Sequence, residues 1–138
     1  MEYIVDDRAL SAPAFLSLAN HVWPGEYDAA KTQQALEKTI NITAYERNQL
    51  IGCIRILSDG YYFGTITELL VLPSYQNKGI GSKLLDLAKA HTPTLLYFGA
   101  QPGAEGFYEK KRLPKRNAIL YNPKRAALRK TARSITLE

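Results

Sequence analysis

The stretch LLVLPSYQNKGIGSKLLDLAKA, from Leu69 to Ala90, decides the fold that this sequence predicts. It begins with an apolar, strand-like run that stops at Pro73, continues through a polar turn with two glycines, and ends in a helical pattern. The first amides of a helix have no acceptor inside the helix, and the helix dipole favours an anion there. The sequence therefore predicts a strand, a turn that can hold phosphate, and a helix.

Two common phosphate-binding loops do not fit this turn. A Walker A loop requires G-x-x-x-x-G-K-[ST]; Gly81 is followed by Ser82 and Lys83, but the required earlier glycine is missing. A dinucleotide fingerprint requires a third glycine where this chain has Leu84. On spacing alone, a plain strand–helix connection stays an alternative.

Length and composition indicate one domain. The chain has 138 residues, of which 46% are hydrophobic and 22% charged, as in an ordinary globular protein with a single core. Cys53 is the only cysteine, so an intramolecular disulfide is excluded. The sequence shows neither a signal peptide nor an apolar run of about 20 residues, the length that spans a bilayer. We expect a cytoplasmic protein with no membrane partner.

Hydrophobic periodicity and turn residues predict an α/β domain with a mixed sheet. Ser11 and Asp28 have the side chains that cap helix N-termini, and residues 21–28 read as a loop because Trp-Pro-Gly cannot continue a helix. The expected elements are, in order, a strand at 2–5, helices at 11–20 and 29–40, a hairpin over 41–60 with its turn near 47–49, a strand at 61–72, a helix from 80, a strand at 94–100, a helix at 103–111 and a strand at 117–121.

The quoted stretch resembles the acetyl-CoA-binding signature of the GNAT superfamily of N-acetyltransferases, whose core is [QR]-x-x-G-x-[GA]. Gln76, Gly79 and Gly81 fill this core, and the preceding ELLVLP and the later GFYEK are also typical of small bacterial members. The resemblance extends over residues 1–121 and leaves 122–138 as a basic C-terminal tail. It implies a mixed, mostly antiparallel central sheet with flanking helices.

The resemblance also implies where acetyl-CoA binds. Two neighbouring parallel strands should splay apart, so that backbone groups of Leu70, Val71 and Leu72 are free to pair with the pantetheine arm as an added strand would. The amide of Val71 would donate to the thioester carbonyl. The amides of the turn would hold the pyrophosphate; they belong to Gln76, Asn77, Lys78, Gly79, Ile80, Gly81 and Ser82.

Acetyl transfer to a primary amine by direct attack in a ternary complex needs a base for the amine and a proton for the leaving thiolate. By the resemblance, Tyr108 protonates the thiolate; the alternative is a tyrosine that only packs against the cofactor. Glu68 is the candidate general base, acting through water. Its alternative is a strand carboxylate that faces solvent or pairs with Arg55.

Other reactive residues are weaker candidates. His21, expected in a loop, and His91, at a helix end, lack the further ligands of a metal site, and we expect no metal. Cys53 reads as a buried structural thiol, and the Ser82 hydroxyl as a phosphate contact. Four aromatic residues are candidates for the walls of an acceptor pocket, with plain packing as the alternative: Trp23, Tyr27, Tyr61 and Tyr62.

The charge of the chain is divided sharply. Residues 1–109 hold 8 Lys+Arg against 12 Asp+Glu, a balance of −4, whereas 110–138 hold 10 against 1, a balance of +9. The family pattern also changes here, because Lys111-Arg112-Leu113 stands where members continue with Gly-Phe. We favour a divergent C-terminus; a nucleic-acid or acidic-partner arm and a shifted reading frame are the alternatives.

Two function classes follow. The sequence favours an N-acetyltransferase with acetyl-CoA as cosubstrate and a small-molecule or peptide amine as acceptor. The alternative is a non-catalytic acyl-CoA-binding sensor or interaction module of the same fold. The resemblance also suggests a homodimer, whereas the acceptor is not readable from these motifs.

Overall fold

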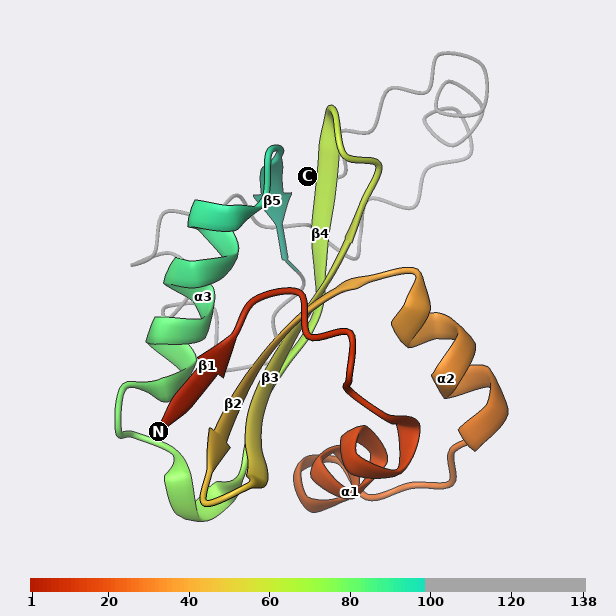
Figure 1. Ribbon diagram of the computed structural model, residues 1–138, viewed down its shortest axis with the longest axis vertical. Coiled ribbons are helices and arrows are strands. Elements are labelled where there is room, and N and C mark those ends of the chain that lie inside the picture. Colours follow the sequence, from red (N-terminus) through yellow and green to blue (C-terminus); the bar gives the residue numbers. More distant parts are fainter. Residues whose placement is uncertain (99–138) are drawn as a thin grey trace.

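The computed structural model describes residues 1–98 (Figure 1). The predictions that involve Tyr108, the GFYEK helix, the last strand and the basic tail lie outside these residues. Within residues 1–98 the elements are β1 (Glu2–Ile4), α1 (Ala12–Val22), α2 (Ala29–Glu37), β2 (Ile40–Glu46), β3 (Gln49–Ser58), β4 (Phe63–Val71), a 3-10 turn (Pro73–Tyr75), α3 (Ile80–His91) and β5 (Leu95–Tyr97).

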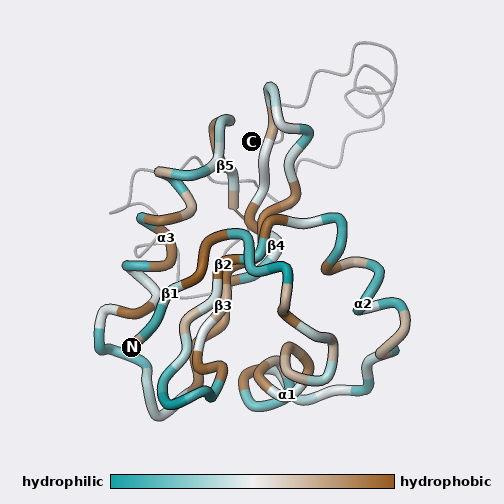
Figure 2. The backbone as a smooth tube through the Cα atoms, in the orientation of Figure 1, coloured by the Kyte–Doolittle hydropathy of each residue, from teal (hydrophilic) through white to brown (hydrophobic). Residues whose placement is uncertain are grey.

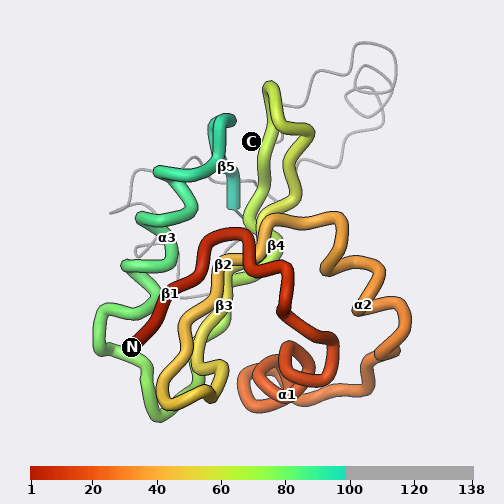
Figure 3. Tube along the Cα trace, in the orientation of Figure 1, coloured from red at the N-terminus to blue at the C-terminus, as the bar shows by residue number. Residues whose placement is uncertain are grey.

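The five described strands form one sheet in the order β1-β2-β3-β4-β5, so that sequence neighbours are also sheet neighbours (Figure 3). Every pair is antiparallel except β4 and β5, which are parallel. Helices α1 and α2 lie on one side of the sheet and α3 lies on the other (Figure 1). The predicted mixed, mostly antiparallel sheet with flanking helices is confirmed.

The predicted helix caps are confirmed. Ser11 Oγ accepts a hydrogen bond from the Ala14 amide at 3.3 Å, and Asp28 Oδ1 accepts one from the Lys31 amide at 3.0 Å. Each cap satisfies one of the amides that a helix start leaves without a partner.

Three predicted boundaries were wrong. The first helix continues to Val22, so His21 lies in its last turn and not in a loop. Ile40, which continued the apolar spacing of the second helix, begins β2 instead, because tertiary pairing with Ile56 overrides local periodicity. β4 begins at Phe63, after the turn that holds Tyr61 and Tyr62.

The core lies between the sheet and its helices, and Figure 2 shows apolar residues concentrated along the central strands while α2 is largely hydrophilic. Helix α3 approaches β3 most closely at Gly52. A Cβ built there would lie 3.2 Å from Leu84 Cδ1 and 3.3 Å from Ile80 Cγ2. Contacts this short leave little room for a side chain, so a glycine at this position lets α3 pack against the sheet and fixes where its N-terminus lies.

Candidate active site

The parallel pairing of β4 with β5 is described for three residues only. Phe63, Gly64 and Thr65 pair with Leu95, Leu96 and Tyr97. At Gly64 the two strands are so close that an added Cβ would lie 2.6 Å from Thr94 Oγ1. Among the described residues, the rest of β4, residues 66–71, pairs with β3 alone. The side of β4 that faces away from β3 is therefore where a pantetheine arm would pair as the predicted added strand.

The end of β4 offers fewer free backbone groups than the sequence predicted. The Leu72 amide donates to Ile51 O at 2.9 Å, and Leu72 O accepts from the Tyr75 amide at 2.8 Å. Leu72 is thus already paired, and the expectation that its backbone is free was wrong. In an antiparallel ladder, the backbone N–H and C=O groups of successive residues point alternately to the two sides of the strand. Those of Leu70 therefore point toward β3, as the Leu72 amide does, and those of Val71 point away from it.

Gln76 closes over this edge. Its Nε2 donates to Val71 O at 3.0 Å, so the first residue of the glycine motif is tied to the end of β4. Its backbone amide donates to Pro73 O at 3.3 Å, so the prediction that this amide is available for a pyrophosphate was wrong. The hydrogen bond from Nε2 is consistent with the pairing of β4 and β3, because the carbonyl of Val71 points to the side away from β3. Of the three residues predicted to pair with a pantetheine arm, Val71 alone keeps an amide directed to that side.

The turn that follows carries two residues with positive φ. Asn77 has φ 63° and Gly79 has φ 82° with ψ 3°, in the left-handed region. A Cβ built on Gly79 would meet no described atom within 4 Å, so the space beside this backbone is open. Lys78 lies beside the turn, with Nζ 5.5 Å from the centroid of the Tyr75 ring. The turn therefore combines backbone that glycine allows, open space and a cation.

Helix α3 starts directly from this turn. Its first helical hydrogen bond in the described structure runs from the Lys83 amide to Gly79 O at 3.0 Å. The amides of a first helical turn point out of the helix start. Within residues 1–98, α3 starts without a side-chain cap and has no acidic residue in its first turn. These features fit a phosphate group, whose oxygens accept hydrogen bonds from the amides of a helix start.

Glu68 and Arg55 form a buried ion pair opposite each other on β4 and β3. Arg55 Nε donates to Glu68 Oε2, and Arg55 Nη2 donates to Oε1 at 3.0 Å. Their side chains are only 14% and 17% exposed, respectively. Burial lowers the pKa of the Arg55 guanidinium, but the hydrogen bond and charge of Glu68 outweigh this and raise it. The pairing named as the alternative for Glu68 is therefore present, and its role as a base stays a prediction.

A bulge in β4 sets this pairing. The register passes from Arg55↔Glu68 to Ile56↔Ile66, which leaves Thr67 as the extra residue. Thr67 Oγ1 donates to Glu68 Oε2 at 3.0 Å. A carboxylate has about four lone-pair sites, and three are used by these described hydrogen bonds, which leaves one site on Oε1.

A hollow of about 170 Å³ lies beside this ion pair, between β4 and the two helices α1 and α2. Trp23 and Tyr27 line it and are 40% and 45% exposed; that they wall an acceptor pocket stays a prediction. Tyr61 and Tyr62 do not; they are 80% and 87% exposed on the β3–β4 turn. The described lining consists of Phe15, Leu16, Ala19, Trp23, Tyr27, Thr32, Ala35, Arg55, Glu68 and Leu70.

The sequence analysis missed Phe15 and Leu16 as pocket residues, because their spacing on the first helix indicated a core face. Arg55 lies 5.6 Å from the centroid of the Phe15 ring, so the helix supplies a wall of the charged site as well as core packing. Helical periodicity predicts which face is covered but not whether a hollow is left beneath it.

A second buried polar cluster was also missed. Asp7, only 4% exposed, accepts hydrogen bonds from Thr43 Oγ1 at 2.8 Å and from the Tyr45 hydroxyl at 3.0 Å. Burial and then the hydrogen bond to Asp7 raise the pKa of Tyr45 to about 12. The cluster ties the segment after β1 to β2, and we assign it a structural role.

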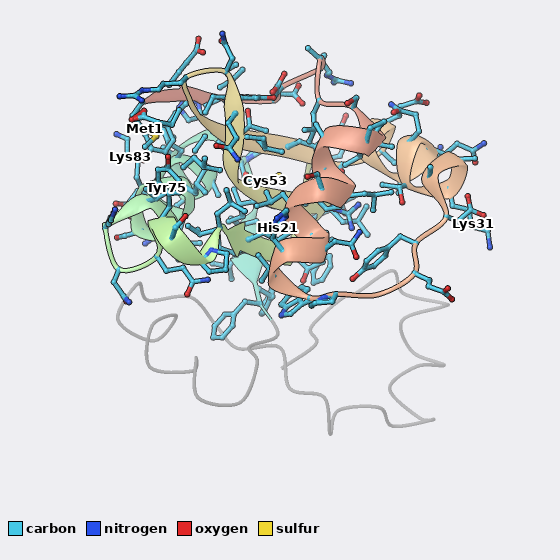
Figure 4. All side chains as sticks on the ribbon, turned by 90° about the horizontal axis from the view of Figure 1, so that it is seen from below. Met1, His21, Lys31, Cys53, Tyr75 and Lys83 are labelled. Carbon is cyan, nitrogen blue, oxygen red and sulfur yellow. The ribbon has the colours of Figure 1, made fainter. Side chains whose placement is uncertain are left out.

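The weaker candidates stay outside the site. Cys53 is buried (Figure 4), and burial followed by the charge of Glu68 raises the pKa of its thiol, so it is held as a neutral thiol. His21 Nδ1 lies 2.7 Å from Ser17 O on α1, and His91 ends α3. Residues 1–98 contain no cluster of three or more metal-ligating side chains, and no helix among them has the length and apolar character to cross a bilayer.

Comparison with known families agrees with this geometry. The sequence model of the acetyltransferase (GNAT) domain matches residues 37–111, which is more than half of the 138-residue chain. The chain belongs to the GNAT acetyltransferase family. The match includes β2 to β5 and the whole turn between β4 and α3.

Solved structures of the same fold are numerous. A protein of unknown function from meticillin-resistant Staphylococcus aureus superposes with a TM-score of 0.74 at 18% identity, over 86% of this chain and 94% of that one. A GNAT-family acetyltransferase from Streptococcus pneumoniae gives 0.66 at 24% identity, over 81% and 87%. The PaiA N-acetyltransferase from Thermoplasma acidophilum, solved with coenzyme A, gives 0.55 at 18% identity, over 81% and 89%. At these identities the likeness concerns the fold.

Proposed function

We propose that this chain is an acetyl-CoA-dependent N-acetyltransferase that moves an acetyl group to a primary amine by direct attack in a ternary complex. The observation that carries the proposal is the start of α3 at Gly79, which has open space and no capping side chain within the described chain and lies directly after the end of β4. Family membership makes coenzyme A the anion to expect there.

In the proposed complex, amides of residues 77–82 bind the pyrophosphate and Lys78 adds a positive charge beside it. The Val71 amide, directed away from β3, donates to the thioester oxygen, on which negative charge grows during attack. The thioester supplies an acyl carbon that is open to attack and a thiolate leaving group. The hollow beside Glu68 and Leu70 receives the acceptor, because both residues belong to the same end of β4.

The chemistry requires an uncharged amine nitrogen. Glu68 accepts the proton of the ammonium through water, using the lone-pair site on Oε1 that Arg55 and Thr67 leave. The nitrogen then bonds to the acetyl carbon as the carbon–sulfur bond breaks, and Tyr108 gives its proton to the sulfur. The nitrogen loses its second proton as the amide forms, and this proton restores the Tyr108 hydroxyl through water. The buried, neutral Cys53 offers no nucleophile, which favours direct transfer over a cysteine-bound intermediate.

The first test is calorimetric titration of the full chain with acetyl-CoA, with a Gly79→Glu variant and a Gly60→Glu control. Both glycines have nearly the same φ, 82° and 83°, and open space around the Cβ position, so the two substitutions impose the same backbone strain. We expect a carboxylate at 79 to repel the pyrophosphate and weaken binding at least 100-fold, while the control stays within about twofold of wild type. No binding by the intact chain, or equal losses in both variants, would contradict the proposal.

A non-catalytic acyl-CoA sensor is the second candidate, and one observation favours it: both oxygens of Glu68 are held by Arg55. Replacing Glu68 by Gln and Tyr108 by Phe separates the two functions. A catalyst should lose turnover by about 10²-fold or more and keep its acetyl-CoA affinity, because each group is assigned to proton transfer. A wild-type chain that binds acetyl-CoA and acetylates no amine would identify the sensor.

A further inference from the structure

We infer that the acceptor is a primary monoamine with a short apolar body, preferably aromatic, and that diamines and longer polycations are poor acceptors. The inference rests on the proposed function, since it assigns the hollow beside Glu68 to the amine. It narrows the acceptor from any amine to a class defined by charge and shape.

The two charged residues that line the hollow neutralise each other. Among its described lining residues, Arg55 is the one cation and Glu68 the one carboxylate, and they are bonded to each other. One amine can approach the remaining site on Glu68 Oε1 and lose its proton there. A second ammonium on the same molecule would meet no unpaired carboxylate in the described lining and would lose water without compensation.

The nearest other acids do not change this balance. Asp28, at the start of α2, uses Oδ1 to cap the Lys31 amide, and Glu26 lies on the exposed loop and outside the described lining. The rest of the chain, 99–138, holds 10 Lys+Arg against 3 Asp+Glu. Whatever this segment contributes, its composition does not favour a polycation.

The remaining lining is apolar and aromatic. Phe15 stands beside Arg55, and Trp23 and Tyr27 are partly exposed at the hollow, with the Tyr27 hydroxyl bonded to Trp23 O at 2.6 Å. That bond uses the polar end of Tyr27 within the loop, so its ring can face an apolar guest. The volume of about 170 Å³ is below the roughly 300–1,000 Å³ of pockets that hold drug-sized ligands, so the hollow favours a small acceptor.

The reaction is balanced for such a substrate. The ammonium gives one proton to Glu68, which passes it to water. The amine nitrogen then bonds to the acetyl carbon, the carbon–sulfur bond of acetyl-CoA breaks with its electron pair on sulfur, and the second proton lost by the nitrogen is matched by the proton that sulfur gains. The products are an uncharged N-acetyl amide and coenzyme A.

The test compares matched acceptors with the full chain: pentylamine against 1,5-diaminopentane, which differ by one terminal ammonium, and 2-phenylethylamine as the aromatic probe. We expect kcat/KM for pentylamine to exceed that for the diamine by at least about 30-fold, and 2-phenylethylamine to be the best of the three. Equal or better turnover of the diamine would overturn the inference and leave the proposed function intact. Acetylation of none of the three by a chain that binds acetyl-CoA would also overturn it, whereas failure to bind acetyl-CoA would overturn the proposed function itself.

Two adjacent positions on α2 provide a matched pair of variants. Both positions are exposed, but Ala35 belongs to the described lining of the hollow and Gln34 does not. Ala35→Glu would place an unpaired carboxylate in the hollow, and Gln34→Glu would add the same charge beside it. We expect Ala35→Glu to raise the ratio of diamine to pentylamine turnover at least tenfold and Gln34→Glu to change it less than twofold; equal ratios in both variants would contradict the charge argument.

The aromatic preference has its own control. Trp23→Ala should raise the KM for 2-phenylethylamine about tenfold and change that for pentylamine much less, because it removes a ring at the hollow. Tyr62→Ala removes an aromatic side chain that is 87% exposed on the β3–β4 turn and should leave both values unchanged. A loss that is equal for both amines would show that Trp23 supports the fold and does not select the substrate.

Discussion

Two turns of this chain use glycine in the same way and differ in how their backbone amides are satisfied. Gly60, between β3 and β4, and Gly79, before α3, have φ of 83° and 82°. In both cases a Cβ would meet no described atom within 4 Å. Backbone conformation and open space therefore do not distinguish a structural turn from a binding turn.

The two turns differ in whether the chain itself supplies an anion to the backbone amides. In the first turn Asp59 Oδ1 accepts hydrogen bonds from the amides of Tyr61, Tyr62 and Phe63 at 2.8, 2.8 and 3.1 Å. These bonds hold the pKa of Asp59 below its ordinary value. In the second turn, α3 starts with neither a capping side chain nor an acid in its first turn, as far as the chain is described.

The other helices make the same contrast. Ser11 caps α1 and Asp28 caps α2, so two of the three described helices begin with an acceptor from their own chain. Local signals agree with structure throughout a stable fold except where function requires otherwise. A helix start with no side-chain cap in the described chain, next to a strand end that pairs with a described strand on one edge only, is where we expect an external anion.

The sharpest way to break this contrast is to give α3 its own anion. Ser82→Glu places a carboxylate in the first turn of the helix, at the position from which a glutamate can reach back to the N-cap amide. We expect the free energy of unfolding to rise by about 0.3–1 kcal/mol, and acetyl-CoA affinity to fall by about 10- to 100-fold because two anions compete for the same amides. Denaturant unfolding and calorimetry measure the two effects separately.

The control for this substitution is Ser82→Gln, which has the same size and no charge. It should lose much less affinity and gain no stability from the helix dipole. Equal losses of affinity in both variants would mean that bulk, and not charge, blocks the turn.

A second experiment compares the two glycines directly. Gly60→Ala and Gly79→Ala each force an L-residue into the left-handed region, which costs about 1–2 kcal/mol of the free energy of unfolding. Since φ and surroundings match, we expect the two losses to agree within about 0.5 kcal/mol. Only Gly79→Ala should also weaken acetyl-CoA binding, by severalfold, because its methyl group enters the open space beside the turn. Unequal stability losses would show that the glycines are not equivalent in the free protein.

The sequence predicted those parts of the site whose signals are local. The glycine turn, the caps Ser11 and Asp28, and the element order all depend on residues within about one helical turn of each other. Family resemblance then supplied the function that we propose for the turn. Each of these features can be predicted without knowing the register between strands.

The parts that the sequence did not predict depend on register and tertiary contact. The sequence offered pairing of Glu68 with Arg55 only as one alternative, because the bulge at Thr67 shifts β4 by one residue, and a one-residue shift changes which side chains share a face. The amide of Leu72 is used because Ile51 lies opposite it. The hollow exists because α1 and α2 meet the sheet with space between them, which periodicity does not encode.

The smallest effect that we predict concerns the turn with its own anion. Asp59→Asn keeps an acceptor oxygen and removes the charge, so the variant should unfold at a slightly lower temperature than wild type at pH 7. The folded-state pKa of Asp59 lies below the ordinary value of 3.8, so its contribution is present above that value and is lost as the pH falls through the folded-state pKa. The difference in Tm between wild type and variant should therefore shrink in acid. Glu26→Gln, which removes the same charge from an exposed loop, is the control. A difference that stayed constant down to about pH 2.5 would show that the three amides bind Asp59 by geometry alone, and that charge does not distinguish this turn from the one at Gly79.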